Sequence, residues 1–351
     1  MSNKPTSWVT KKLGDICLES QYGLNCPATG GKYPILGMKN LNGGKIKVDD
    51  LAFVDLTFEE MQKFRLNHGD LLINRTNSLD LVGKSALFDL QGDYVFASYL
   101  VRFIIDRSAA DPLYVNFYCN SHIGISQMQR LATKGVSQAN INPTELKKNF
   151  RIPIPPLSEQ RKIAEVLSTW DEAIVHTERL IIALQQRKKG FMQRLLTGEV
   201  RFPGLDGEWR EVKLGDIFIE RIERGFDNLP LLSISEYGIT YRDESNRRDK
   251  SSEDKSKYLR ICSGDIGYNT MRMWQGRSAL SQYEGIVSPA YTILKPKKSI
   301  DVRYMAYLFK YRPMIHTFSR YSQGLVSDTW SLKYPAFAKI HVKIPSTSGR
   351  K

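Results

Sequence analysis

WVTKKLGDI at residues 8–16 returns as WREVKLGDI at residues 209–217. Three further segments repeat in the same order: HGDL (68–71) with SGDI (263–266), GKSAL (83–87) with GRSAL (276–280), and FRIPIP (150–155) with IHVKIP (340–345). One such match would carry little weight, but four in the same order indicate that a whole unit has been duplicated. Each copy spans about 140–150 residues, which is the size of a domain.

Each copy mixes strand and helix patterns. Residues 71–73, 99–105 and 291–294 are apolar runs bounded by Gly-Asp or Pro turns, which is typical of buried strands. Residues 114–128 and 303–318 carry aromatic and aliphatic side chains at intervals of three and four, which predicts a helix in each range. The expected fold class is therefore α+β, with two homologous domains.

The segment between the copies has a different pattern. Pro155 and Pro156 end the first copy, Ser158 is the expected N-cap, and no proline follows from residue 159 to residue 197. Apolar positions recur there in alternating steps of four and three, as along the seam of a coiled coil, interrupted by Thr177 and Lys188. The positions expected to form a helix interface are Ile163, Leu167, Trp170, Ile174, Ile181, Leu184, Phe191 and Leu195.

Two interpretations of this helix are open. It could lie across the core of one domain, but about 40 residues make a rod of about 60 Å, longer than the groove a domain usually offers. The favoured interpretation is a spacer whose apolar stripe is covered by a second helix, because soluble proteins avoid large uncovered apolar patches. The expected organisation is a first domain at 1–157, a spacer helix at 158–200, a second domain at 201–345 and a tail at 346–351.

Composition limits the classes of function. The 351 residues include 51 Lys and Arg against 37 Asp and Glu, a net charge of +14 that favours a polyanionic partner such as nucleic acid or an anionic membrane face. No run of about 18 apolar residues exists, so no membrane-spanning helix is expected. The first residues carry no hydrophobic signal core, and the four cysteines have no short pair spacing, so neither a zinc site nor a disulfide framework is predicted. A cytoplasmic location is expected.

Motifs for catalysis are weak in this sequence. Gly83-Lys84-Ser85 has the end of a phosphate-binding loop, but Ser78 stands where that motif needs glycine, so a turn before a strand is the better interpretation. The five histidines are far apart in the sequence and have no partner at metal-ligand spacing. We predict no catalytic residue, no metal ligand and no cofactor bound by this chain.

IPIPPLSEQRKIA at residues 152–164, followed by the helix and by FMQRLLTG at residues 191–198, resembles the central conserved region of type I restriction-modification specificity (S) subunits. The paired openings at Trp8 and Trp209 resemble the starts of the two target-recognition domains of that family. The resemblance implies a DNA-recognition and scaffold subunit in which each domain reads half of a split target in double-stranded DNA. It also implies docking to methyltransferase (M) subunits, joined by restriction (R) motor-nuclease subunits, with S-adenosylmethionine, ATP and Mg²⁺ used by those partners.

The sequence differs from the family at one place. Full-length members continue from the second domain into another Pro-Pro-Leu-Ser-Glu-Gln-like segment and an antiparallel helix, whereas residues 343–351 read KIPSTSGRK. We therefore expect a second copy of the chain, or a helix of the methyltransferase subunit, to cover the stripe. The alternatives left open are a DNA-modifying enzyme that acts alone and an assembly-defective cassette of the same family.

Candidates for DNA contact are Arg, Asn, Gln and Lys in loops, because these side chains make paired hydrogen bonds to base edges in the major groove. In the first copy the candidates are Asn74, Arg75, Asn77, Lys84, Lys134, Ser137, Gln138 and Asn140. In the second copy they are Asn269, Arg272, Trp274, Gln275, Arg277 and Gln323. For Arg242, Arg247, Arg248 and Lys250 two interpretations stay open, contact with DNA phosphates and plain solvation.

Overall fold

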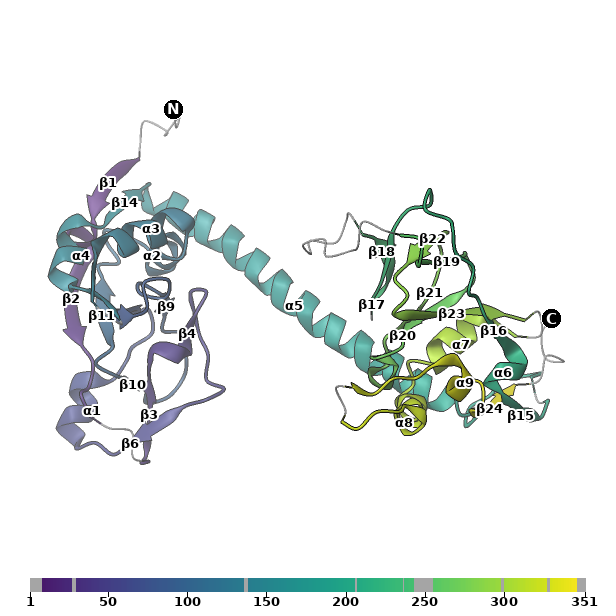
Figure 1. Cartoon of the computed structure of the whole chain (residues 1–351). Helices are drawn as coiled ribbons and strands as arrows, with labels where there is room; N and C mark the ends of the chain where they lie inside the picture. The colour runs from purple at the N-terminus through teal and green to yellow at the C-terminus, as the bar shows by residue number, and fades with distance from the viewer. Residues whose placement is uncertain are drawn as a thin grey trace. The chain divides into compact units, whose positions relative to one another are not determined.

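The computed structural model describes residues 8–26, 30–135, 138–205, 207–235, 237–242, 255–297, 300–326 and 329–345. The chain divides into two compact units, Met1–Arg179 and Leu180–Lys351 (Figure 1). Both units combine helices with strands, which confirms the predicted α+β class. The predicted boundaries, which set the spacer helix apart as a segment of its own, stay a prediction.

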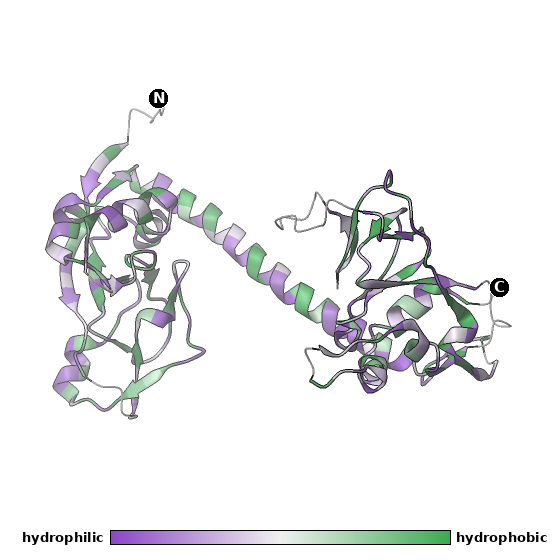
Figure 2. Ribbon diagram, viewed as in Figure 1, coloured by the Kyte–Doolittle hydropathy of each residue, from purple (hydrophilic) through white to green (hydrophobic). Residues whose placement is uncertain are grey.

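The long helix α5 runs from Leu157 to Leu195, 39 residues without a break. It begins one residue before Ser158, so this serine lies in the first turn and is not the N-cap that the sequence predicts. Gly198 follows the end of α5 with φ +74°, a left-handed conformation that suits glycine and ends the helix. Apolar and polar residues alternate along α5 in Figure 2, in agreement with the predicted stripe. In the described part of the chain, none of the helices is both long and apolar enough to cross a membrane.

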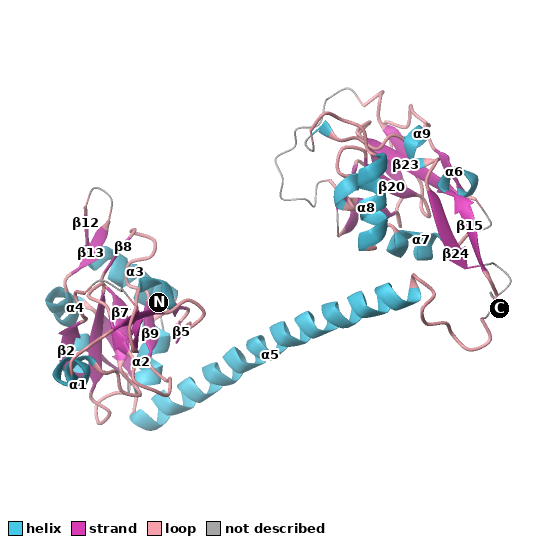
Figure 3. Ribbon diagram, turned by 90° about the horizontal axis from the view of Figure 1, so that it is seen from below, coloured by secondary structure: helices cyan, strands magenta, loops and turns pink. Residues whose placement is uncertain are grey.

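The first unit is built on a four-stranded antiparallel sheet of order β2-β11-β7-β9. Its strands β2, β7 and β9 are labelled in Figure 3. Leu71 and Ile73 of β7 lie in a core with α2 and α3, whereas Leu72 lies in a second core with Phe96 on the other face. A smaller sheet of order β10-β3-β6 and α1 adjoin that second core. The strands are β1 (Val9–Lys12), β2 (Cys17–Tyr22), β3 (Tyr33–Leu36), β4 (Leu41–Asn42), β5 (Lys45–Ile46), β6 (Ala52–Val54), β7 (Leu71–Asn74), β8 (Thr76–Asn77), β9 (Ser85–Leu87), β10 (Val95–Phe96), β11 (Leu100–Ile105), β12 (Ala132–Lys134), β13 (Ala139–Ile141) and β14 (Arg151–Ile154). The short helices are η1 (Leu13–Ile16), η2 (Met38–Asn40), α1 (Phe58–Phe64), α2 (Pro112–Cys119), α3 (His122–Leu131) and α4 (Pro143–Asn149).

The second unit repeats this plan. Its four-stranded sheet has the order β16-β23-β20-β21, and β15 pairs with β24 as β1 pairs with β14. The strands are β15 (Trp209–Lys213), β16 (Phe218–Glu220), β17 (Leu232–Ser235), β18 (Gly238–Tyr241), β19 (Leu259–Ile261), β20 (Ile266–Asn269), β21 (Ser278–Leu280), β22 (Gly285–Val287), β23 (Tyr291–Pro296) and β24 (His341–Pro345). The helices are α6 (Leu214–Ile217), η3 (Met273–Gln275), α7 (Val302–Leu308), α8 (Arg312–Tyr321) and α9 (Tyr334–Phe337). The internal repeat predicted from the four matched segments is confirmed.

Two predicted helices are each divided in the structure. Residues 114–128 fall in α2 and α3, because Ser121 caps a new helix by accepting a hydrogen bond from the backbone of Gly124 at 3.1 Å. Residues 303–318 fall in α7 and α8, and Pro313 lies in the first turn of α8, where proline is favoured. The three- and four-residue spacing continues through each break, so periodicity alone did not reveal it.

Gly83-Lys84-Ser85 forms a turn before β9, as the sequence favours. Gly83 has φ +83°, and Ser85 is buried at the start of β9, where its hydroxyl accepts a hydrogen bond from the side chain of Asn120 at 2.9 Å. A phosphate-binding loop would instead lead from a strand into a helix.

Candidate nucleic-acid interface

A three-stranded ribbon of order β12-β13-β8 gathers four of the predicted DNA contacts of the first unit. Thr76 lies opposite Asn140 and Asn77 lies opposite Ala139, while Lys134 pairs with Ala139 from the other side. Lys134, Gln138 and Asn140 are exposed and Asn77 is partly exposed. We call residues 76–77, 132–134 and 138–141 the polar ribbon. Ser137 lies outside the described residues.

Asn74 does not reach the surface. It is the last residue of the central strand β7, its side chain is fully buried, and its Oδ1 accepts a hydrogen bond from the backbone of Thr76 at 3.2 Å. The prediction that Asn74 reads a base does not fit this position, and the side chain instead shapes the turn from β7 into β8. Arg75 is partly exposed, and its guanidinium lies over the ring of Tyr22 at 5.0 Å.

A groove of about 820 Å³ adjoins the polar ribbon. Asn77 and Lys84 line it together with residues that sequence reasoning missed: Lys39, Asn42, Lys47 and Tyr99. Its described lining holds three lysines and no carboxylate, although Lys39 also pairs with Asp50 outside the lining. Such a groove attracts a phosphate backbone. The signal for it was the Lys- and Asn-rich stretch at 38–47, but only the fold places this stretch beside Lys84.

In the second unit the predicted contacts lie on two adjoining loops, residues 269–277 and the described residues 323–326 and 329–331. The backbone of Leu332 donates to the carbonyl of Thr270 at 2.8 Å, and Trp274 packs edge-on against Trp330 with ring centres 5.6 Å apart. Asn269 repeats the role of Asn74, because its Oδ1 accepts from the backbone of Met271 at 3.0 Å. We call these two loops the tip of the second unit.

The other predicted contacts of the second unit differ in availability. Gln275, Arg277 and Gln323 are exposed, and Arg272 is partly exposed. The indole nitrogen of Trp274 donates to the carbonyl of Met271 at 3.0 Å, so it is already engaged. Among the four basic residues for which phosphate contact is one open interpretation, Arg242 follows β18, whereas Arg247, Arg248 and Lys250 lie outside the described residues.

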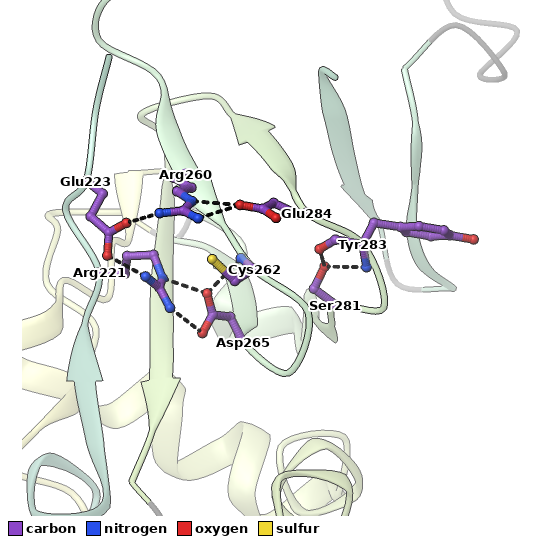
Figure 4. A network of polar contacts seen from close by, with 8 residues as sticks. All are labelled: Arg221, Glu223, Arg260, Cys262, Asp265, Ser281, Tyr283 and Glu284. Atoms are coloured by element: carbon purple, nitrogen blue, oxygen red, sulfur yellow. Dashed lines mark hydrogen bonds and ion pairs between the residues drawn. The ribbon is translucent and has the colours of Figure 1, made fainter. Parts of the chain in front are cut away.

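In each unit an arginine–aspartate pair lies at the start of the strand that leads to the candidate interface. In the second unit the Nε of Arg221 donates to Asp265 at 2.7 Å, and Arg260 joins Glu223 to Glu284 (Figure 4). Asp265 also accepts from the backbone of Cys262 at 2.8 Å. The hydrogen bonds from Arg221 to Asp265 raise the pKa of the arginine. Asp265 immediately precedes β20, the strand that ends at the tip.

The first unit makes the same pair with an arginine from a different strand. Arg102 on β11 lies 3.4 Å from Asp70, and burial raises the pKa of this carboxyl while Arg102 opposes the rise. Arg102 pairs across the sheet with Gln21, and the equivalent pair in the second unit is Ile293 with Arg221. The arginine thus lies on β11 in the first copy and directly after β16 in the second, while the aspartate keeps the same position.

The start of α5 packs against the first unit at a site around Trp8, Asp111 and Tyr114, which we call the seat. The indole nitrogen of Trp8 donates to Glu159 at 3.2 Å, and the hydroxyl of Tyr114 donates to the carbonyl of Pro153 at 2.6 Å. Gln160 is fully buried and bonds to the backbone of Asp111 and of Pro155, each at 2.8 Å. Through these contacts the Pro-Pro-Leu-Ser-Glu-Gln segment, which lies between β14 and α5, anchors the start of α5 to the first unit.

The second unit has the same seat without these contacts. Trp209 and Tyr304 correspond to Trp8 and Tyr114, and their buried Nε1 and hydroxyl atoms have no hydrogen-bond partner among the described residues. Burial raises the pKa of Tyr304 to about 12, so its hydroxyl remains a donor at neutral pH. An apolar hollow of about 760 Å³ adjoins them, lined by side chains that include Leu184, Phe191 and Leu195 of the predicted stripe.

The remaining stripe positions are distributed along α5. Ile163 packs against the core of the first unit, and Leu195 is partly buried. The exposed positions are Leu167, Trp170, Ile174, Ile181, Leu184 and Phe191. Within the described residues, no group of three or more His, Cys, Asp and Glu side chains is arranged to hold a metal ion.

The comparisons with known proteins agree with one another. Residues 5–186 match the family model described as type I restriction modification DNA specificity domain. A protein of Methanocaldococcus jannaschii assigned as the MjaX type I restriction enzyme specificity subunit is 29% identical over 60% of this chain and 53% of its own length. The type I restriction enzyme MjaVIII specificity subunit of the same organism is 23% identical over 92% of this chain and 77% of its own length. The chain thus spans about half the length of the first of these relatives.

A solved structure has the same fold. The S subunit of a type I restriction-modification system from M. genitalium aligns over 99% of this chain and 88% of its own length, with a TM-score of 0.60 and 16% identity. The family match covers more than half of the sequence, and the fold and the internal repeat agree with it. The chain therefore belongs to the type I restriction-modification DNA specificity domain family.

Proposed function

We propose that this chain is the DNA-recognition and scaffold subunit of a type I restriction-modification complex. The observation that carries the proposal is the repeat itself: two homologous units present two exposed sites of different chemistry at equivalent places, the polar ribbon and the tip. Two unlike readers on one chain suit a bipartite target in double-stranded DNA. The net charge of +14 and the lysine-lined groove supply the attraction to phosphate.

The scaffold role rests on α5. Its exposed stripe and the seat beside Trp209 call for a second helix, which we assign to a methyltransferase subunit or to a second copy of this chain. Restriction subunits join the same complex in this proposal. Methylation with S-adenosylmethionine and cleavage with ATP and Mg²⁺ belong to the partners, and this chain is non-catalytic.

Selection of bound sequences from random duplexes tests the recognition role. The chain with its methyltransferase subunit is expected to enrich two short sequence blocks separated by a fixed gap. Enrichment of one block or none contradicts the proposal. Methylation or cleavage by the chain alone, with S-adenosylmethionine, Mg²⁺ and ATP supplied, would support the lone-enzyme alternative. Light scattering distinguishes the proposal from the assembly-defective alternative. Such a cassette would give no increase in mass when it is mixed with the methyltransferase subunit.

Gln138→Ala is expected to weaken binding to the selected target by about 1–3 kcal/mol and to relax one sequence block only. The reason is that Gln138 is exposed on the polar ribbon, where its amide can reach a base edge. Lys47→Ala is the comparison variant, because the loss of a lysine from the groove should weaken binding to all sequences alike. Binding curves on target and random duplexes measure both effects. Equal weakening of both duplexes by Gln138→Ala would place this residue among the phosphate contacts.

Trp8→Phe is expected to act mainly on stability, and Trp209→Phe mainly on assembly. Both remove an indole N–H and similar volume, but only Trp8 has a hydrogen-bond acceptor in the described chain. Trp8→Phe should therefore lower the free energy of unfolding by about 1 kcal/mol more than Trp209→Phe. Trp209→Phe should weaken assembly with the partner, whereas Trp8→Phe should not. Urea denaturation and light scattering measure the two quantities, and equal effects of the variants in both assays would argue against an occupied seat.

A further inference from the structure

Two apolar side chains stand in solvent at the tip of the second unit. Leu325 is fully exposed and Val326 is 59% exposed. The loop that carries them is closed by hydrogen bonds, because the backbone and hydroxyl of Thr329 donate to the carbonyl of Val326 at 2.9 and 2.8 Å. A Cβ on Gly324 would lie 2.7 Å from the backbone of Thr329, so this glycine allows a tight loop. The structure therefore holds Leu325 outward.

The repeat shows which place this loop occupies. In the first unit the backbone of Ile141 donates to Arg75 at 2.8 Å, and in the second unit the backbone of Leu332 donates to Thr270 at the same distance. Both loops follow the second helix of a pair, α3 or α8, and both return to the turn after the central strand. Leu325 and Val326 thus stand where the first unit carries the loop of Lys134 and Gln138.

Cations beside the loop favour DNA over a protein as the occupant. Arg272 and Arg277 lie on the adjoining loop, which packs on α8 through Gly276 and Ile315. Arg320 is exposed on the last turn of α8, just before the loop of Leu325. These side chains flank the apolar pair with the charge that phosphates require.

We propose that Leu325 and Val326 recognise thymine 5-methyl groups in the half of the target that the second unit reads. The inference rests on the proposed function and adds the chemistry of one reader. The thymine methyl is the apolar feature that a base pair presents in the major groove, where a loop or ribbon of this kind can enter. The first unit reads with hydrogen-bonding side chains, whereas the second unit reads partly by apolar contact.

Deoxyuridine tests this, because it removes the methyl and keeps the base pair. Selected duplexes are resynthesised with deoxyuridine replacing thymine in one half at a time, and their binding to the full chain with its methyltransferase subunit is measured. In the half read by the second unit, each contacted methyl removed should weaken binding about fourfold. Leu325→Ala with Val326→Ala should bind the thymine and deoxyuridine duplexes alike. Ile219→Ala is the matched control, because Ile219 is a half-exposed apolar residue on β16, away from the tip. It pairs with Lys295 of β23, which lies four residues from Tyr291, the residue that pairs with Asn269 of the tip.

The outcomes separate this inference from the proposed function. Absence of any sequence preference in the wild-type chain contradicts the proposed function. A bipartite preference with equal binding of thymine and deoxyuridine duplexes overturns only the methyl contact, as does full discrimination by the double variant Leu325→Ala with Val326→Ala. A rise in the fluorescence of 2-aminopurine placed in the duplex, without a deoxyuridine effect, would mean that Leu325 inserts between bases. Loss of methyltransferase assembly in Leu325→Ala, again without a deoxyuridine effect, would mean that the tip binds protein.

Discussion

Replacing Ile174 and Ile181 by Asp is expected to abolish assembly of the chain with the partner that covers α5. Both side chains are about half exposed in the structure and lie on the stripe of alternating four- and three-residue steps. In the assembled state the new carboxylates would be buried without a counter-charge, which costs several kcal/mol and weakens association more than a hundredfold. Light scattering of the chain mixed with its methyltransferase subunit measures the loss.

The control places the same charges on the other side of the helix. Ala183→Asp with Gln186→Asp changes the net charge equally at exposed positions outside the stripe. This variant should assemble normally, and both variants should retain the far-ultraviolet circular dichroism of the parent. Unchanged assembly of the Ile174 and Ile181 variant would mean that the stripe is not an interface.

The architecture was accessible from the sequence because duplication repeats its own signals. The two Trp-containing openings, the Gly-Asp turns and the final Pro-containing strands recur in order, and the structure pairs β1 with β14 as it pairs β15 with β24. The long helix could also be predicted, because few structures other than a helix are compatible with so long a run of apolar positions in alternating steps of four and three residues. Helix breaks were not, because Ser121 and Pro313 act locally while the apolar spacing runs on.

The candidate interface could be predicted only in part, for reasons of geometry. Polar loop residues such as Gln138 and Asn140 do lie together, because loops at one end of a sheet meet there. Asn74 does not suit base contact because its side chain is buried at the end of β7, and polarity alone does not show this. Lys39 and Lys47 were missed because their place beside Lys84 depends on how β3 to β6 fold back. Trp209 was visible in the repeat, but its missing acceptor is a property of the folded chain.

The pair of Arg221 and Asp265 is expected to stabilise the second unit. Asp265→Ala is expected to lower the free energy of unfolding of the second unit by about 3–5 kcal/mol. The side chain of Arg221 is only 9% exposed, and the substitution removes the carboxylate that faces it on two nitrogens, at 2.7 and 3.2 Å. Glu223 remains beside Arg221, but it also serves Arg260 and is 40% exposed, so it compensates poorly. A loss of this size is a large share of the stability of a domain.

A double variant separates the lost pair from the lost residue. Arg221→Met with Asp265→Asn removes both charges and keeps an oxygen for the backbone of Cys262, so it should restore most of the stability, because replacing both partners is far less costly than stranding one. Tryptophan fluorescence in urea reports mainly on the second unit, which holds Trp209, Trp274 and Trp330, and hydrogen exchange of β20 and β23 locates the change. Asp70→Ala should act in the same way on the first unit, since Arg102 is 8% exposed there. Equal stability of Asp265→Ala and the parent would show that the pair does not hold β20, and the different place of the arginine in the two copies would then need another explanation.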